Sequence, residues 1–141
     1  MVCIFCHNET EVTNSRAKSR TPSVWRRRAC KQCVAQFTTT ELPDYTKALK
    51  VLSMDSRKLN PFSRDKLFLS LYQSLGHRKD ALDSSTALTT TVIGRLINKK
   101  FVINGAIETK SISKVAYEAL KRYDPLAAAT YKAYHQLTLK S

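Results

Sequence analysis

Every cysteine of this 141-residue chain lies in one of two stretches, Cys3-Ile4-Phe5-Cys6-His7 and Cys30-Lys31-Gln32-Cys33. Each stretch contains a C-x2-C pair, and 23 residues separate the two pairs. Such a pair forms a tight knuckle that points two thiolates at one ion, and two knuckles complete a tetrahedral site of four sulfur ligands. The spacing therefore predicts one structural Zn²⁺ on Cys3, Cys6, Cys30 and Cys33, because four soft ligands leave no open coordination position.

The first stretch has two other interpretations when it is taken alone. Cys3 to His7 matches the C-x-x-C-H pattern of covalent haem attachment, and a C-x-x-C pair can also be a redox dithiol. Both interpretations leave the second pair without a role, and no basic segment followed by an apolar run resembles an export signal. We therefore expect an intracellular, thiol-reducing location. His7 is expected to occupy a turn position, with Val34 as its counterpart, and a site of three cysteines and His7 is the alternative.

The chain carries 24 Lys and Arg against 11 Asp and Glu, for a formal charge of +13. Residues 1–45 hold 7 basic and 4 acidic side chains, and residues 46–141 hold 17 and 7, so both parts are positive. This surplus indicates nucleic acid, nucleotides or an anionic surface as partners, and a solvated basic face is the alternative. No apolar run approaches the length of a membrane span, so no membrane partner is expected.

Three short β-compatible runs surround the cysteines, over residues 11–16, 23–28 and 35–41. They predict a small β-ribbon in which zinc supplies much of the folding free energy. Val24 and Arg26 should share one strand face and Trp25 and Arg27 the other, because side chains alternate along a strand.

Arg26, Arg27 and Arg28 put positive charge on both faces of one predicted strand, which suits contacts with phosphates or guanine edges. Arg16 and Lys18 could extend the same patch, and a solvated edge strand is the alternative. Two aromatic residues, Trp25 and Phe37, are expected to form the small apolar core under the knuckles, and stacking on DNA is the alternative for them. The basic strand is thus the candidate DNA-binding surface.

The part after residue 45 predicts an α+β unit with its own core. A β-compatible run over 48–53 and a short run before Pro61 indicate a hairpin, and 101–107 a loop or short extended piece turning at Asn104-Gly105. Four helices are expected, the first between an N-cap Ser63 and Gly76, the second over 84–99, and the last starting at Asp124-Pro125. Their apolar faces are Phe68, Leu71, Tyr72 and Leu75; Leu88, Val92, Ile93, Leu96 and Ile97; Ile112, Val115, Ala116 and Leu120; and Leu126, Tyr131, Tyr134 and Leu137.

No enzyme is predicted. The three glycines, Gly76, Gly94 and Gly105, are too scattered for a dinucleotide-binding or Walker A loop. His77 and His135 accompany no nucleophile with the spacing of a reactive site, and we expect both to be surface histidines.

The segments MVCIFCHNETEVTNSR (1–16), SVWRRRACKQC (23–33), FTTTE (37–41) and NPFSRDKL (60–67) together resemble the NrdR family of bacterial repressors of ribonucleotide reductase genes. The resemblance implies a zinc ribbon over 1–45 that binds double-stranded operator DNA, followed by an ATP-cone over 46–141 that senses ATP and dATP. It also implies a cytoplasmic, nucleoid-associated homo-oligomer whose assembly changes with the bound nucleotide.

The resemblance assigns roles to particular residues. The family's zinc ligands match Cys3, Cys6, Cys30 and Cys33, and its basic DNA-binding face matches Ser15, Arg16, Arg26, Arg27 and Arg28. The family's nucleotide site matches the F-x-x-x-K residues Phe62 and Lys66 and the pocket residue Val51. The last predicted helix lacks an arginine and one aromatic residue of the family, but Tyr131 and Tyr134 could stack on a base.

The chain also departs from the family pattern. Family members usually carry glycine where this chain has His7 and Val34, and basic residues where it has Ser53 and Met54. Lys50, Arg57 or Lys58 could replace these basic residues. The missing cone lysines support a second hypothesis, in which the ribbon docks on RNA polymerase or the reductase and the cone is only an assembly scaffold.

Overall fold

The computed structural model describes residues 1–19, 22–53, 56–98 and 101–135. The chain divides between Asp44 and Tyr45 into two compact units, here called the ribbon unit (Met1–Asp44) and the helical unit (Tyr45–Ser141). Among the described residues, no helix is long and apolar enough to cross a membrane.

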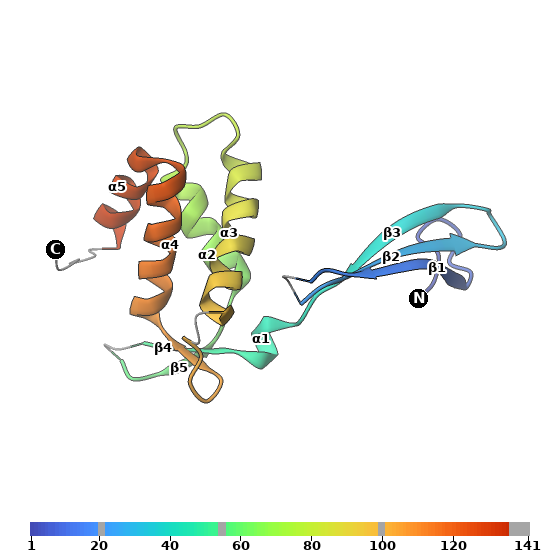
Figure 1. The fold of residues 1–141 in the computed structure, drawn as a ribbon, viewed down its shortest axis with the longest axis horizontal. Coiled ribbons are helices and arrows are strands. Elements are labelled where there is room, and N and C mark those ends of the chain that lie inside the picture. Colours follow the sequence, from blue (N-terminus) through green and yellow to red (C-terminus); the bar gives the residue numbers. More distant parts are fainter. Residues whose placement is uncertain (20–21, 54–55, 99–100, 136–141) are drawn as a thin grey trace. The chain divides into compact units, whose positions relative to one another are not determined.

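The sheet of the ribbon unit contains three antiparallel strands in the order β1-β2-β3 (Figure 1). They are β1 (Thr10–Ala17), β2 (Val24–Cys30) and β3 (Gln36–Glu41), so the three strands predicted from the sequence are confirmed. Valine and threonine favour these extended segments because branched side chains pack well on a pleated surface. The register shifts between Val12 and Asn14, where Thr13 is the extra residue of a β-bulge.

Strand pairing separates the arginines into two groups. Arg16 lies opposite Trp25, and Arg27 shares the face of Trp25 because the two residues are two positions apart. Arg28 lies opposite Phe37 and belongs to the other face. Phe37 shares the face of Arg28, because residues opposite each other on paired strands lie on the same face. Trp25 lies on the other face, because it is three positions from Arg28 on β2. The prediction that Trp25 and Phe37 form one core is therefore wrong.

A second three-stranded sheet lies at one end of the helical unit. Following the short helix α1 (Tyr45–Ala48), β4 (Lys50–Leu52) pairs antiparallel with β5 (Leu59–Pro61), which confirms the predicted hairpin. On its other side, β4 pairs parallel with β6 (Ala106–Glu108). The segment before β6 turns at Asn104 and Gly105, both of which have positive φ.

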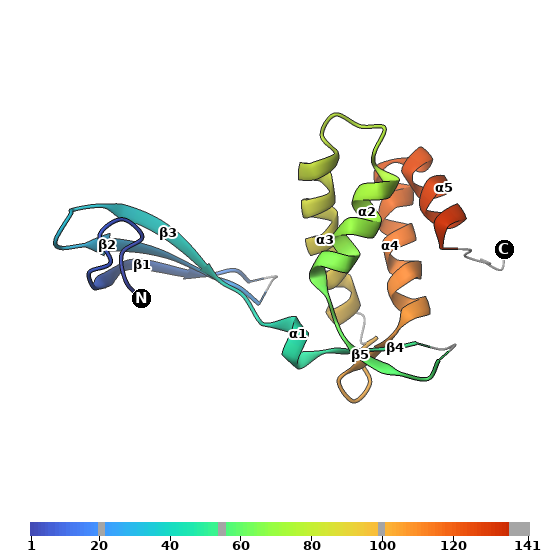
Figure 2. The same ribbon diagram turned by 180° about the vertical axis from the view of Figure 1, so that it is seen from behind.

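Four helices pack together beside this sheet, as both views of the chain show (Figures 1 and 2). They are α2 (Arg64–Ser74), α3 (Ala81–Asn98), α4 (Thr109–Tyr123) and α5 (Pro125–Tyr134). Ser63 caps α2 by accepting a hydrogen bond from the Lys66 amide, and Asp124 caps α5 by accepting from the Leu126 and Ala127 amides. Both predicted N-caps are confirmed.

One apolar core holds the helices and the sheet together. Its larger members include Leu71, Leu75, Leu96, Ile107, Leu120 and Tyr131, all of which are nearly inaccessible to solvent. Burial of this many aliphatic side chains gives the helical unit its own source of stability. The predicted apolar faces of α3 and α4 are confirmed, with Ile97 and Ile112 half-buried at the margin.

The predicted apolar face of α2 is confirmed at Leu71 and Leu75, which are buried, and is wrong at Phe68 and Tyr72. Leu67, Leu71 and Ser74 are buried along this helix, whereas Phe68 and Tyr72 stack on each other outside the core with ring centroids 6.0 Å apart. Both faces satisfy helical spacing, so the periodic pattern could not distinguish them. On α5, Tyr131 is buried as predicted but Leu126 and Tyr134 are exposed, and Leu137 lies outside the described residues.

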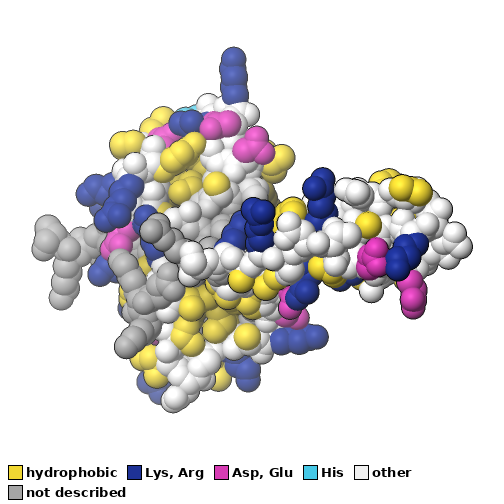
Figure 3. Space-filling view, turned by 45° about the vertical axis from the view of Figure 1, so that its right-hand side comes forward, with side chains coloured by type: hydrophobic (Ala, Val, Ile, Leu, Met, Phe, Trp, Pro, Cys, Tyr) yellow, Lys and Arg dark blue, Asp and Glu magenta, His cyan; other side chains and the backbone are white. Residues whose placement is uncertain are grey.

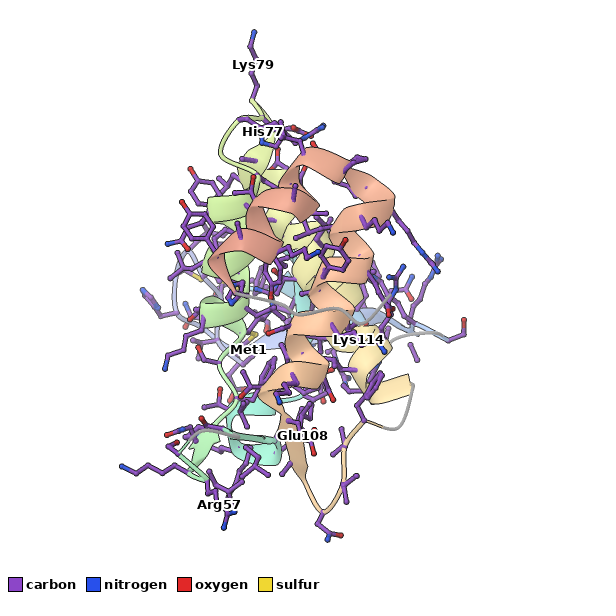
Figure 4. All side chains as sticks on the ribbon, turned by 90° about the vertical axis from the view of Figure 1, so that its left-hand side faces the viewer. Met1, Arg57, His77, Lys79, Glu108 and Lys114 are labelled. Atoms are coloured by element: carbon purple, nitrogen blue, oxygen red, sulfur yellow. The ribbon has the colours of Figure 1, made fainter. Side chains whose placement is uncertain are left out.

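A polar cluster occupies the end of the bundle that carries His77 and Lys79, opposite the end that carries Arg57 and Glu108 (Figure 4). Asp124 is buried there, and its Oδ2 lies 3.0 Å from His77 Nε2 and 3.2 Å from Arg78 Nη1. The Ala127 amide, followed by His77, holds the pKa of Asp124 at about 2. Asp124 therefore joins the loop after α2 to the start of α5 through its charge.

Candidate metal centre and binding surfaces

The four cysteines of the ribbon unit converge on one point. Their sulfur atoms all lie within 4.8 Å of one another, with 3.6 Å between Cys3 and Cys33 and 3.5 Å between Cys6 and Cys30. Four sulfurs around Zn²⁺ at about 2.3 Å would lie roughly 3.8 Å apart, so the group has the size of a tetrahedral zinc site. Cys3 and Cys30 are buried and Cys33 is exposed. This donor set of four thiols fits one Zn²⁺ with a closed coordination shell.

Each cysteine pair lies in a similar backbone turn. In the first knuckle the Cys3 amide donates to the Asn8 carbonyl at 2.7 Å, and in the second the Cys30 amide donates to the Ala35 carbonyl at 3.0 Å. His7 and Val34, which follow the last cysteine of their pairs, both have φ of 58°. Left-handed backbone is the reason for glycine at such positions, and it is strained for a β-branched valine. The expected turn role of these two residues is confirmed.

Contacts within the cysteine group move the pKa values of two thiols, Cys6 and Cys33, in opposite directions. The Asn8 side-chain amide lies 3.4 Å from Cys6 Sγ, and this contact, with the Asn8 backbone amide, lowers the pKa of Cys6 to about 6. The Ala35 amide also favours the thiolate of Cys33, but contact with the other thiols and partial desolvation raise the pKa of Cys33 to about 12. Neighbouring thiols lose their protons in steps, and a bound dication replaces those protons.

The five predicted DNA-binding residues fall on two faces of the ribbon sheet. Arg16 and Arg27 are exposed on the face that carries Trp25, and neither forms an ion pair with a carboxylate in the described part of the chain. Ser15 and Arg26 lie opposite each other on the second face, where Arg26 pairs with Glu41 at 3.0 Å. Arg28 also belongs to the second face, but it is half-buried. Among these five residues, the exposed charges without an ion pair are therefore those of Arg16 and Arg27.

A cavity of about 360 Å³ lies between the small sheet and the helices of the helical unit. Four of the five predicted nucleotide-binding residues line it, namely Val51, Phe62, Lys66 and Tyr131. Lys50 does not line it, because adjacent residues of a strand point to opposite faces and Val51 faces the cavity. The structure thus brings together two aromatic rings and one cation that are far apart in the sequence.

The remaining lining residues are mostly small and polar, and sequence reasoning missed them: Asn60, Ser63, Ser70, Thr109 and Ser113, with Pro61, Leu67, Ile112 and His135 beside them. Hydroxyl residues are too common for their type to indicate a site. The His135 ring lies 4.2 Å from that of Tyr131, and burial lowers the pKa of His135 and raises that of Tyr131. Two adjacent rings, tilted by 37°, thus contribute to the lining of the cavity.

Basic side chains near the cavity are few. Lys66 is the one lysine or arginine among its lining residues, all of which belong to the described part of the chain. Arg57 and Lys58 lie in the turn between β4 and β5, where Ser53 donates its amide to the Lys58 carbonyl. Met54, at one of the two usually basic positions, lies outside the described residues.

Comparison with known proteins identifies the family. The family model described as "Transcriptional repressor NrdR-like, N-terminal domain" matches residues 1–41. The transcriptional repressor NrdR of Chlamydia pneumoniae is 34% identical over 128 residues, which cover 90% of this chain and 80% of the relative. The repressor of the same name from Chlamydia muridarum is 30% identical over 142 residues, covering 97% and 90%. The chain belongs to the NrdR family.

The NrdR match over residues 1–41 ends at Glu41, the last residue of β3. It therefore contains all four cysteines and the whole three-stranded sheet, so the predicted zinc ribbon is confirmed. NrdR relatives are named as regulators of transcription and not as enzymes. Haem attachment and dithiol chemistry, the other interpretations of Cys3 to His7, find no support in this family.

Proposed function

We propose that this chain is a transcriptional repressor that binds operator DNA of ribonucleotide reductase genes through its zinc ribbon and responds to ATP or dATP through its helical unit. Family membership supports the repressor role. The observation that carries the DNA-binding part is the exposed face of the ribbon sheet around Trp25. On this face Arg27 of β2 and Arg16 of β1 hold positive charge, and neither pairs with a carboxylate among the described residues.

The proposed DNA-binding surface combines two arginines with an aromatic side chain. Arg16 and Arg27 can grip phosphates or donate two hydrogen bonds to a guanine edge. Trp25 is half-buried between them and offers an aromatic surface beside the cations. Ser15 and Arg26 are proposed to contact the backbone from the second face, where release of Arg26 from Glu41 would accompany binding. Lysine and arginine side chains lie on the visible surface of each unit in Figure 3.

The nucleotide site is proposed to be the cavity of the helical unit. Tyr131 and Phe62 provide the apolar, aromatic wall that a purine base requires, and Lys66 provides a point charge for phosphate. The cavity volume of about 360 Å³ is within the range of small-ligand sites. Two further basic residues of the helical unit, Lys50 and Arg57, are exposed and do not line the cavity. Nucleotide binding is proposed to change the number of chains in a homo-oligomer and so the arrangement of ribbons on DNA.

Arg27→Ala tests the DNA-binding proposal. We expect this variant to bind a duplex from upstream of a ribonucleotide reductase gene about 10 to 100 times more weakly in fluorescence anisotropy, with a shallower salt dependence. Lys31→Ala is the matched control, because Lys31 belongs to the same ribbon and already pairs with Glu11. Equal losses in the two variants, or no loss in Arg27→Ala, would exclude this face as the binding surface.

Calorimetric titration of the zinc-loaded protein with dATP and with ATP tests the nucleotide proposal. Saturable binding should disappear in Lys66→Ala and persist in Lys132→Ala, which removes an exposed lysine from α5 that does not line the cavity. Sedimentation velocity on the same samples should show a change of oligomer with nucleotide. Absence of heat from a folded, zinc-loaded sample would contradict nucleotide sensing and leave the DNA-binding proposal standing.

One observation favours a second candidate function, docking on another protein. Ile4, Phe5 and Val34 on the two zinc knuckles have exposed fractions of 56%, 67% and 81%. Exposed apolar side chains of this kind are typical of interfaces. Co-elution with purified RNA polymerase or reductase in the absence of DNA, lost in Phe5→Ser, would support this function over the repressor.

A further inference from the structure

Arg28 occupies the middle of β2, opposite Val12 on β1 and Phe37 on β3. Its side chain lies on the same face as Cys30, which is two residues further along the strand. Arg28 Nη1 donates to Thr10 Oγ1 at 3.3 Å, and Thr10 is the strand partner of Cys30. The guanidinium therefore extends along the sheet toward the strand position of the metal ligand Cys30.

Arg28 differs from Arg27 in burial and from Arg26 in its charge partner. Arg27 is exposed, and Arg26 has a carboxylate partner in Glu41. The Nε atom of Arg28 is buried and has no hydrogen-bond partner, and no described carboxylate forms an ion pair with this side chain. A buried guanidinium N–H without a partner is costly, and negative charge nearby would offset part of that cost.

The cysteine group would supply that charge. Four thiolates around one Zn²⁺ carry a net charge of −2, and two of the four cysteines, Cys3 and Cys30, are buried. A cation close to such a centre stabilises it, because attraction between charges strengthens as water is excluded. We propose that Arg28 is a positioning residue of the metal centre, which balances the charge of the zinc-bound thiolates and is not a DNA contact.

Thr10 also connects Arg28 with the first knuckle. Thr10 Oγ1 accepts from Arg28 and donates to the Met1 carbonyl at 2.6 Å. Val2 and Glu9 form a bridge in the same segment, and the Cys3 amide donates to the Asn8 carbonyl. Arg28 thereby orients the segment that carries Cys3 and Cys6, in addition to its effect through charge.

The test is the zinc dissociation constant, measured by competition with a chromogenic chelator. Arg28→Met removes the charge at similar length, and we expect it to weaken zinc binding about 10- to 100-fold. Arg28→Lys keeps the charge and should remain within about threefold of the parent. Arg27→Met is the matched control: it removes a charge from the adjacent, exposed position and should leave zinc affinity unchanged.

The proposal would be overturned if Arg28→Met bound zinc as tightly as the parent, or if Arg27→Met weakened zinc binding equally. It would also be overturned if Arg28→Lys lost as much zinc affinity as Arg28→Met, because the shape of the side chain and not its charge would then be responsible. Should Arg28→Met not fold even with excess zinc, Thr10→Val provides the test, because it removes the tether and should weaken zinc binding measurably. The proposal rests on the zinc site and not on DNA binding. Anisotropy on the same variants therefore separates the two: Arg28→Met with saturating zinc should bind DNA more tightly than Arg27→Met.

Discussion

The two units of this chain are stabilised in different ways. In the ribbon unit the buried residues among those described are Cys3, Ser23 and Cys30, and two of these three are candidate metal ligands. In the helical unit a single cluster of 18 buried apolar residues joins the sheet to four helices. The ribbon unit, with about 40 residues, therefore relies on a metal for its stability, whereas the larger helical unit relies on apolar burial.

Removal of zinc should produce the largest difference between the units. Because a zinc site of this kind contributes about 10 kcal/mol or more to folding, chelation should unfold the ribbon unit. The helical unit should keep its fold, since its core contains no candidate ligand. Amide exchange measured with and without chelator would show this as loss of protection confined to residues 1–44. Loss of protection across both units would mean that the helical core depends on the metal.

Leu120→Ala should have the opposite effect. Leu120 is fully buried in the helical core, and the cavity left by the truncation should cost about 3 kcal/mol of the free energy of unfolding. Urea denaturation followed by helix content measures the loss, and chelator competition should give the parental zinc affinity. Leu126→Ala, at an exposed position on α5, is the control and should change stability little. A shift in zinc affinity would contradict the independence of the two units.

Acid should affect the helical unit through Asp124. The folded pKa of about 2 lies below the usual value of 3.8, so the ionised form stabilises the fold at neutral pH and this contribution declines as the pH falls from about 4 to 2. Asp124→Asn should therefore lower stability at pH 7 by about 1 to 2 kcal/mol through the loss of the charge beside His77 and Arg78, because asparagine can still cap α5. Thermal melts of both proteins should converge near pH 2. A difference that persists there would assign the effect to packing.

Val34→Gly should cause the smallest change, and in the favourable direction. Relief of a β-branched residue from φ of 58° is expected to stabilise the zinc-bound ribbon by about 1 kcal/mol, or roughly a fivefold tighter zinc constant. Val34→Ala keeps a Cβ in the same backbone conformation and should gain much less. If alanine and glycine give equal gains, the exposed valine side chain and not the backbone is responsible.

Local patterns predicted most of the fold. The cysteine spacing indicated the metal centre, the caps at Ser63 and Asp124 indicated the starts of α2 and α5, and short β-compatible runs indicated three ribbon strands. The errors occurred where a local pattern permits two solutions. On α2, Phe68 and Leu67 each satisfy helical spacing, and the register between β2 and β3 was needed to place Trp25 and Phe37 on opposite faces.

The sequence by itself determined the donor set of the metal site, the positive charge of the β2 strand and the family resemblance, because each is a property of residue types at short spacing. The tertiary structure alone decided that β6 pairs parallel with β4 and that Phe62, Lys66 and Tyr131 line one cavity. It also decided that Arg27 is exposed while Arg28 extends toward Thr10 beside Cys30. These features depend on contacts between residues far apart in the chain. A local sequence pattern carries no information about the free energies of such contacts.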